Sequence, residues 1–193
     1  MKSICVYCGS SDAVSPDYLS AARRLGKVLA ERDLRLIYGG GKTGLMGAVA
    51  DGALEKGGEV IGVIIPSMNT NPLAHKGLTR MDVVKGPHAR KARMHELSDG
   101  YIALPGGFGT FDELFETITW GQVGEHEKPV GLLNVKNYFN PLLAALKHAV
   151  KEGFVFREHL EALAFETDPD ALLDAMQNHV HPHEAGRRWM REE

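Results

Sequence analysis

The stretch Tyr101-Ile102-Ala103-Leu104-Pro105-Gly106-Gly107-Phe108-Gly109-Thr110-Phe111-Asp112-Glu113 decides how this chain folds. Its apolar start predicts a buried strand, its glycines predict a tight turn, and a helical pattern begins at Thr110. Backbone amides in such a turn, ahead of a helix N-terminus, bind an anion together with the helix dipole. The side chains that follow are acidic, so a bound phosphate would need cations from another part of the chain.

The same order of apolar strand, turn and helix recurs on both sides of this stretch. Further strands are predicted at residues 3–8, 34–38, 60–65, 78–84, 130–134 and 160–165. Helices are predicted from 16 to about 29, at 43–55, 87–98, 110–122 and 140–152, and from 168 onward. Such alternation indicates a parallel sheet with helices on both faces. We expect a single α/β, doubly wound, Rossmann-like domain over residues 1–178, followed by a polar C-terminal tail at 179–193.

Three small-residue turns follow predicted strands. They are Gly9-Ser10-Ser11, Gly39-Gly40-Gly41 and Pro105-Gly106-Gly107. In doubly wound sheets, ligands bind beyond the carboxyl ends of the strands, at the point where the strand order reverses. We therefore expect the three turns to border one crevice.

The composition is that of an ordinary globular domain. The chain has 193 residues, of which 44% are hydrophobic and 24% charged, enough for one domain with a real core. Its formal net charge of -3 disfavours general binding to nucleic acid or anionic membrane. No apolar run approaches the roughly 18 residues of a membrane span, and the first residues lack a signal-peptide pattern. We expect a cytoplasmic protein without nucleic-acid or membrane partners.

Two groups of residues resemble redox or metal motifs but are interpreted otherwise. Cys5 and Cys8 form C-x-x-C within a predicted strand, whereas the redox motif lies at a helix start. Residues three apart in a strand have Cα atoms about 10 Å apart, too far for a disulfide, so two buried thiols are expected. His179, His181 and His183 alternate in the tail, where a flexible polar segment is favoured over a metal site. No metal site is predicted.

The run Gly39-Gly40-Gly41-Lys42-Thr43-Gly44 fits G-x-G-x-x-G between a strand and a helix, the context of a dinucleotide site. That site also needs an acid at the end of the next strand, which here ends Ile64-Ile65-Pro66. A Walker loop would need glycine where Leu36 stands. Nicotinamide and NTPase functions are therefore disfavoured, and a nucleotide-sized site without either standard fingerprint is favoured.

Glu113 has two interpretations that spacing alone leaves open. Thr110 and Glu113 form T-x-x-E, a capping box in which Thr110 caps the helix and Glu113 returns to the Thr110 amide. Glu113 also lies one turn beyond an anion-binding turn, where a carboxylate can stabilise a cationic sugar or act as acid or base. Asp112 and Glu116 are local alternatives for that role.

A basic cluster precedes the strand at 101–104. Arg90, Lys91 and Arg93 lie on the helix predicted at 87–98, and a solvated basic face is the default interpretation of such a cluster. Arg90 or Lys91 could instead supply the cation that the glycine turn lacks, and the planar arginine fork suits a phosphate. Neighbouring helical residues are about 100° apart, so the two need not share one role.

Together these motifs resemble the LONELY GUY family of cytokinin riboside 5'-monophosphate phosphoribohydrolases, long labelled lysine decarboxylase-like. The resemblance covers roughly residues 3–150. The segments that carry it are Cys5-Val6-Tyr7-Cys8-Gly9-Ser10-Ser11, Tyr38-Gly39-Gly40-Gly41 with Gly44-Leu45-Met46-Gly47, Arg90-Lys91 with Met94, the signature P-G-G-x-G-T-x-x-E from Pro105 to Glu113, Thr119-Trp120, and Lys128-Pro129-Val130-Gly131-Leu132-Leu133-Asn134.

The resemblance implies hydrolysis of the N-glycosidic bond of an N6-substituted AMP, giving the free base and ribose 5-phosphate. It makes Arg90 and Glu113 the catalytic pair, in a homodimer with its sites near the subunit contact. Residues expected around the nucleotide are Lys91, Gly107, Gly109, Thr110 and Thr119 by resemblance, Gly106 and Phe108 as further amides for the 5'-phosphate, and Gly9, Ser10, Gly40 and Gly41 from the shared crevice. Phe115 and Trp120 are assigned to the core or to a subunit contact rather than to a cofactor site.

Two departures from the family pattern leave the N6 group of the substrate open. Pro72 stands where many members have a substrate-contacting Glu, and Gly86-Pro87 replaces a usual Asp-Met or Ser-Met. The decarboxylase label would imply pyridoxal phosphate, but no lysine has a convincing Schiff-base context, so no cofactor is predicted. The alternatives are a general AMP nucleosidase and a nucleotide-binding sensor without turnover, in which Thr110 and Glu113 serve only as a cap.

Overall fold

In the computed structural model, which describes residues 1–182, seven parallel strands form one sheet. The strands are β1 (Ser3–Tyr7), β2 (Arg35–Tyr38), β3 (Val60–Ile64), β4 (Arg80–Val83), β5 (Gly100–Ala103), β6 (Val130–Leu133) and β7 (Ala164–Glu166). Their order is β4-β3-β2-β1-β5-β6-β7. The chain builds outward from β1 to one edge and then from β5 to the other, so the order reverses between these two strands. The predicted α/β doubly wound fold is confirmed.

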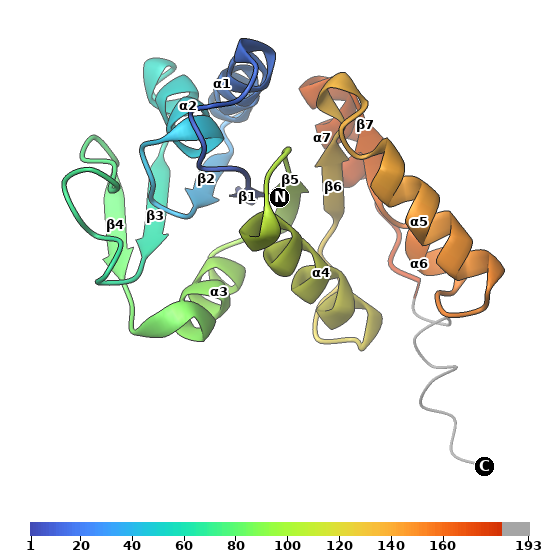
Figure 1. The fold of residues 1–193 in the computed structure, drawn as a ribbon. Helices are drawn as coiled ribbons and strands as arrows, with labels where there is room; N and C mark the ends of the chain where they lie inside the picture. The colour runs from blue at the N-terminus through green and yellow to red at the C-terminus, as the bar shows by residue number, and fades with distance from the viewer. Residues whose placement is uncertain (183–193) are drawn as a thin grey trace.

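Helices cover both faces of the sheet (Figure 1). They are α1 (Pro16–Glu31), α2 (Gly44–Glu55), α3 (Gly86–Glu96), α4 (Phe108–Gln122), α5 (Asn140–Lys151), α6 (Arg157–Glu161) and α7 (Pro169–Gln177), with a 3-10 turn, η1 (Val135–Asn137), before α5. Apolar side chains of α1, α2 and α7 form one half of the core, and those of α3 and α4 lie in the other half. Within residues 1–182, no helix has the length and apolarity needed to cross a membrane.

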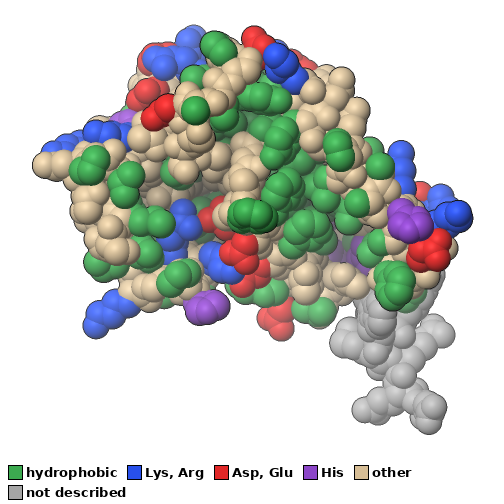
Figure 2. All heavy atoms as spheres, viewed as in Figure 1, with side chains coloured by type: hydrophobic (Ala, Val, Ile, Leu, Met, Phe, Trp, Pro, Cys, Tyr) green, Lys and Arg blue, Asp and Glu red, His purple; other side chains and the backbone are tan. Residues whose placement is uncertain are grey.

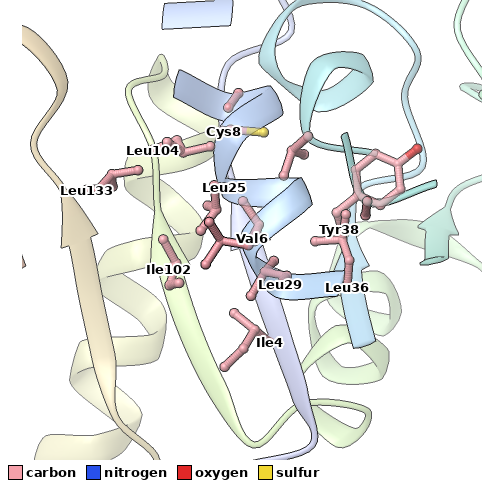
Figure 3. Packing of buried hydrophobic residues seen from close by; sticks show 14 of the residues in the cluster. Ile4, Val6, Cys8, Leu25, Leu29, Leu36, Tyr38, Ile102, Leu104 and Leu133 are labelled. Atoms are coloured by element: carbon pink, nitrogen blue, oxygen red, sulfur yellow. The ribbon is translucent and has the colours of Figure 1, made fainter. Parts of the chain in front are cut away.

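The central strand β1 shows why an uninterrupted apolar run forms this kind of sheet. All five of its residues are buried, because helices lie on both sides. Figure 3 shows Ile4 and Val6 of β1 on the same side as Leu25 and Leu29 of α1. Cys5 belongs to the opposite half of the core. Strand residues alternate between faces, so a run buried on both faces needs apolar residues at every position.

The two cysteines are buried and free, which confirms the prediction of structural thiols. Cys8 packs in the half of the core that contains α1, and Cys5 packs in the other half. Burial raises the pKa of both thiols well above their usual range. A thiol that stays protonated is a poor nucleophile.

The C-terminal third differs from the prediction in one segment. A strand is predicted at residues 160–165. In the structure Leu160 lies in α6, and the strand β7 comprises only Ala164–Glu166. A five-residue helix is too short to show a helical period, so the apolar residues around it look like an extended strand. The predicted start of the last helix is correct, because Asp168 caps α7 through its side chain.

Candidate active site

The carboxyl ends of β1 and β5 meet at the point where the strand order reverses. The Gly9 amide donates to the Pro105 carbonyl over 3.0 Å, and the Gly9 carbonyl accepts from Leu45 at the start of α2 over 3.0 Å. A cavity of about 310 Å³ opens beside this contact. Its lining residues are Gly9, Ser10, Ser11, Val14, Tyr18, Leu45, Pro105, Gly106, Gly107 and Tyr138. Two of the three predicted turns therefore border one cavity.

The third turn has a different place in the structure. Gly39 lies against Arg90, since a Cβ on Gly39 would stand 2.2 Å from a guanidinium nitrogen. Gly40 packs against the side chains of Met81 and Ile64, and its φ is +75°. The Gly41 carbonyl accepts from the Tyr38 hydroxyl over 3.1 Å. Gly39 makes room for Arg90, whereas Gly40 and Gly41 contact protein rather than the cavity.

The N-terminus of α4 is open at the glycine turn. Gly107 is its N-cap residue, and the Phe111 amide donates to the Gly107 carbonyl over 3.1 Å. The amides of Phe108, Gly109 and Thr110 in the first turn therefore have no partner inside the helix. A Cβ on Gly107 or Gly109 would meet nothing within 4 Å, and the Phe108 side chain is 96% exposed. An anion can approach the amides of Phe108 and Gly109 directly.

The capping-box interpretation of Thr110 and Glu113 is wrong. The helix begins at Phe108, two residues earlier than predicted, and Thr110 is buried in its first turn. Glycine at 107 adopts the extended backbone of an N-cap without any side chain. Glu113 turns instead toward α3, where its Oε1 accepts a hydrogen bond from Arg90. Its carboxylate is therefore free of any capping role.

Arg90 and Glu113 form a half-buried pair between α3 and α4. Arg90 Nη1 donates to Glu113 Oε1 over 2.8 Å, and Arg90 Nε donates to the Val63 carbonyl over 2.9 Å. The Glu113 side chain is 11% exposed. Burial raises the pKa of Glu113, although the charge and hydrogen bond of Arg90 act in the opposite direction. This environment suits a carboxylate that must meet a developing positive charge.

Lys91 has a different partner set from its neighbour Arg90. Its Nζ lies 2.8 Å from Glu116 and 3.1 Å from Asp112, both on α4. Burial lowers the pKa of Lys91, but the hydrogen bonds that its ammonium donates to Glu116 and Asp112 outweigh burial, and the net shift of the pKa is upward. Figure 2 shows basic and acidic side chains side by side over α3 and the start of α4. Lys91 ties α3 to α4, and both local alternatives to Glu113 are engaged with it.

The N-terminus of α2 already holds an anion. The Gly44 amide, the first of α2, donates to Asp12 Oδ1 over 2.7 Å. In a dinucleotide site the pyrophosphate occupies this position. The Asp12 carboxylate takes its place here, which adds a physical reason for rejecting the G-x-G-x-x-G fingerprint. No local pattern pointed to Asp12, because its partner is 32 residues away.

Thr119, a predicted site residue, and the histidines at the start of the tail lie apart from this crevice. Thr119 is exposed, and its hydroxyl donates to the Phe115 carbonyl within α4. Ten residues of helix separate Thr119 from Gly109, a distance of about 15 Å. His181 Nε2 lies 3.1 Å from the Gly121 carbonyl, so the start of the tail contacts the end of α4. His183 falls outside the described residues, and no group of three metal-ligating side chains is found within 1–182.

Comparison with known proteins gives consistent results. A family model described as possible lysine decarboxylase matches residues 46–176. The chain is 42% identical over 188 residues to cytokinin riboside 5'-monophosphate phosphoribohydrolase LOG of Oryza sativa subsp. japonica, covering 97% of this chain and 78% of that protein. It is 48% identical over 155 residues to the protein named cytokinin riboside 5'-monophosphate phosphoribohydrolase of Rhodococcoides fascians, covering 80% and 78% of the two chains.

Solved structures with the same fold include the molybdenum cofactor binding protein of Rippkaea orientalis, with a TM-score of 0.69 and 25% identity, covering 92% of this chain and 97% of that one. The molybdenum cofactor carrier protein of Chlamydomonas reinhardtii aligns with a TM-score of 0.68 and 22% identity, covering 92% and 96%. These similarities concern the fold. The sequence similarities to the phosphoribohydrolases extend over most of both chains, so this chain belongs to the LONELY GUY (LOG) family.

Proposed function

We propose that this protein hydrolyses the N-glycosidic bond of an N6-substituted AMP. Water adds at C1' of the ribose, the bond from C1' to the base breaks, and the products are free base and ribose 5-phosphate. The observation that carries the proposal is the half-buried Arg90–Glu113 pair beside the open N-terminus of α4. The phosphoribohydrolase names of relatives at 42% and 48% identity support it.

The charge of each group at the site determines its proposed role in the reaction. Glycoside cleavage passes through a transition state with positive charge at C1', which a carboxylate stabilises. Glu113 supplies that carboxylate, or orients the attacking water, and Arg90 fixes its position. The amides of residues 106–110 receive the 5'-phosphate at the positive end of α4. Arg90, on α3, is the cation that the glycine turn itself lacks.

Glu113→Gln tests the proposal directly. The amide keeps the size and one acceptor oxygen of the side chain but carries no negative charge, so base release should fall by about 10²- to 10⁴-fold. The assay follows free base and ribose 5-phosphate from N6-isopentenyl-AMP. Asp112→Asn is the matched control, because it also converts a carboxylate of α4 to an amide. The native Asp112 carboxylate pairs with Lys91 rather than with Arg90. Base release at the wild-type rate by Glu113→Gln would refute the assignment.

The substrate class is decided in the same assay. Release of adenine from AMP at the rate seen with N6-isopentenyl-AMP indicates a general AMP nucleosidase. Turnover of the riboside that lacks phosphate would contradict the role given to the α4 N-terminus. Binding of nucleotide without any release of base indicates a sensor.

We also infer that the protein is a homodimer joined through the outer face of α4. Phe108 and Phe115 are exposed on this helix and Val123 is exposed at its C-cap, and Thr119 lies on the same face. Thr119 is distant from the crevice of its own chain, and a second copy on this face would give it a place near a site. We include a cytoplasmic location in the proposal.

A further inference from the structure

The glycine turn has a contact that no sequence pattern suggested. The Tyr138 hydroxyl donates to the Gly106 carbonyl over 2.5 Å. Tyr138 follows η1, 32 residues further along the chain. It lines the cavity beside the turn together with Gly106 and Gly107. The contact reaches the turn at the peptide that precedes the N-cap residue of α4.

This hydrogen bond fixes the orientation of one peptide group. The carbonyl of Gly106 and the amide of Gly107 belong to the same planar unit and point in opposite directions. The preceding carbonyl, of Pro105, is held by the Gly9 amide over 3.0 Å. The carbonyl groups of Pro105 and Gly106 are therefore both occupied by partners within the protein. A flip of the second peptide would exchange carbonyl for amide next to the open first turn of α4.

Such a flip would be costly for an anion site. A carbonyl oxygen carries partial negative charge and repels a phosphate, whereas an amide hydrogen attracts it. Peptides between two glycines have few steric barriers of their own, because neither residue has a Cβ. The orientation must therefore be imposed from outside, and the Tyr138 hydroxyl supplies that constraint.

The segment that carries Tyr138 is itself braced. Buried Asn134 accepts from the Phe139 amide over 2.8 Å and donates to Asn140 Oδ1 over 2.9 Å. Lys136 and Asn137 hold left-handed backbone conformations, with φ of 52° and 60°. Non-glycine residues adopt this conformation only where the surrounding structure dictates it. The brace gives the Tyr138 ring a fixed position from which its hydroxyl reaches the turn.

We propose that Tyr138 is a positioning residue for the phosphate-binding turn. Its hydroxyl holds the Gly106–Gly107 peptide in the one orientation that lets the α4 N-terminus receive a sugar 5'-phosphate. The inference rests on the proposed function for the nature of the ligand. Because Tyr138 acts through the turn, its hydroxyl affects binding of the phosphate and leaves the chemical step at C1' unchanged.

Tyr138→Phe is the decisive variant, because phenylalanine keeps the ring and removes only the hydroxyl. The control is Tyr101→Phe, which removes a hydroxyl hydrogen bond to His95 at the opposite end of β5. Titration with ribose 5-phosphate should give a Kd about tenfold higher for Tyr138→Phe, the loss expected for one hydrogen bond near a charge. Tyr101→Phe should bind as the wild type does, with thermal unfolding measured for both variants.

The kinetic readout separates positioning from general damage. With N6-isopentenyl-AMP, Tyr138→Phe should raise KM about tenfold and keep kcat within about twofold. Equal affinity of Tyr138→Phe and wild type for ribose 5-phosphate overturns the inference, as does a fall in kcat alone. If the wild type binds ribose 5-phosphate but releases no base, the proposed function fails while the comparison still decides the role of Tyr138. If the wild type does not bind ribose 5-phosphate, the inference falls too.

Discussion

Glu113 is the residue whose environment most directly predicts a measurable property. Burial raises its pKa above the usual value for glutamate, about 4.3. The proposed role needs the ionised carboxylate, so activity should fall as the pH drops through this raised pKa. We expect the acidic limb of kcat/KM to lie above the ordinary glutamate range, and Glu113→Gln to lack it. A profile recorded from about pH 4 to 8 checks this, and a limb at the ordinary value would contradict the assignment.

The same shift has a consequence for stability, with a definite sign. Between the unfolded and folded pKa values of Glu113 the folded state binds more protons than the unfolded state. The contribution of this residue to the free energy of unfolding therefore decreases as the pH rises through that window. The folded protein is therefore less stable at the pH at which Glu113 ionises and forms the ion pair, which is typical of a functional site.

At this scale the sequence predicts residue types better than it predicts contacts. Arg90 and Glu113 were expected as a pair, and the structure places their charged atoms 2.8 Å apart. The resemblance suggested the pair, because T-x-x-E spacing fits a cap equally well. Asp12 and Tyr138 were not predicted, since each acts on a backbone group 32 residues away. A hydrogen bond to a backbone group far along the chain produces no pattern in the spacing of nearby residues.

At the scale of the element, the turn before α4 makes different demands on its glycines. A Cβ on Gly106 would lie 2.1 Å from Thr110 Oγ1 and 2.8 Å from the Gly9 amide nitrogen. Gly106→Ala should therefore lower the free energy of unfolding by about 1–3 kcal/mol through overpacking. Gly109→Ala adds a Cβ in open space, so its stability should match the wild type while ribose 5-phosphate binds more weakly. Urea unfolding and titration with ribose 5-phosphate measure the two effects.

Each outcome has a clear opposite. Wild-type stability of Gly106→Ala would mean that the turn relaxes around the added methyl group. Wild-type affinity of Gly109→Ala would mean that the ligand does not approach this face of the helix.

The start of α4 itself was predicted two residues late, because glycine at an N-cap carries no side chain that marks it. The buried strands were predicted well, since full burial on both faces requires an uninterrupted apolar run.

At the scale of the molecule, strand order explains why distant segments form one site. The sheet grows from β1 toward β4 and from β5 toward β7. The turns after β1 and β5 therefore diverge to opposite faces, and a crevice opens between them. Alternating strands and helices predicted this architecture, but the strand order itself came only from the structure. For Phe115 the sequence left the core and a subunit contact open, and the structure places its side chain on the exposed face of α4.

The proposed homodimer can be tested on that face. Phe115 is 40% exposed and lies near Val123 and Thr119 along the outer side of α4. Phe115→Asp would bury a charge in an apolar contact, so the protein should sediment as a monomer with an unchanged circular dichroism spectrum. Phe154→Asp is the matched control, since Phe154 is 78% exposed in the turn between α5 and α6. A monomeric wild type would refute the dimer, and a dimeric Phe115→Asp would place its contact elsewhere. If Phe115→Asp loses both dimerisation and base release, Thr119 of one protomer contributes to the crevice of its partner.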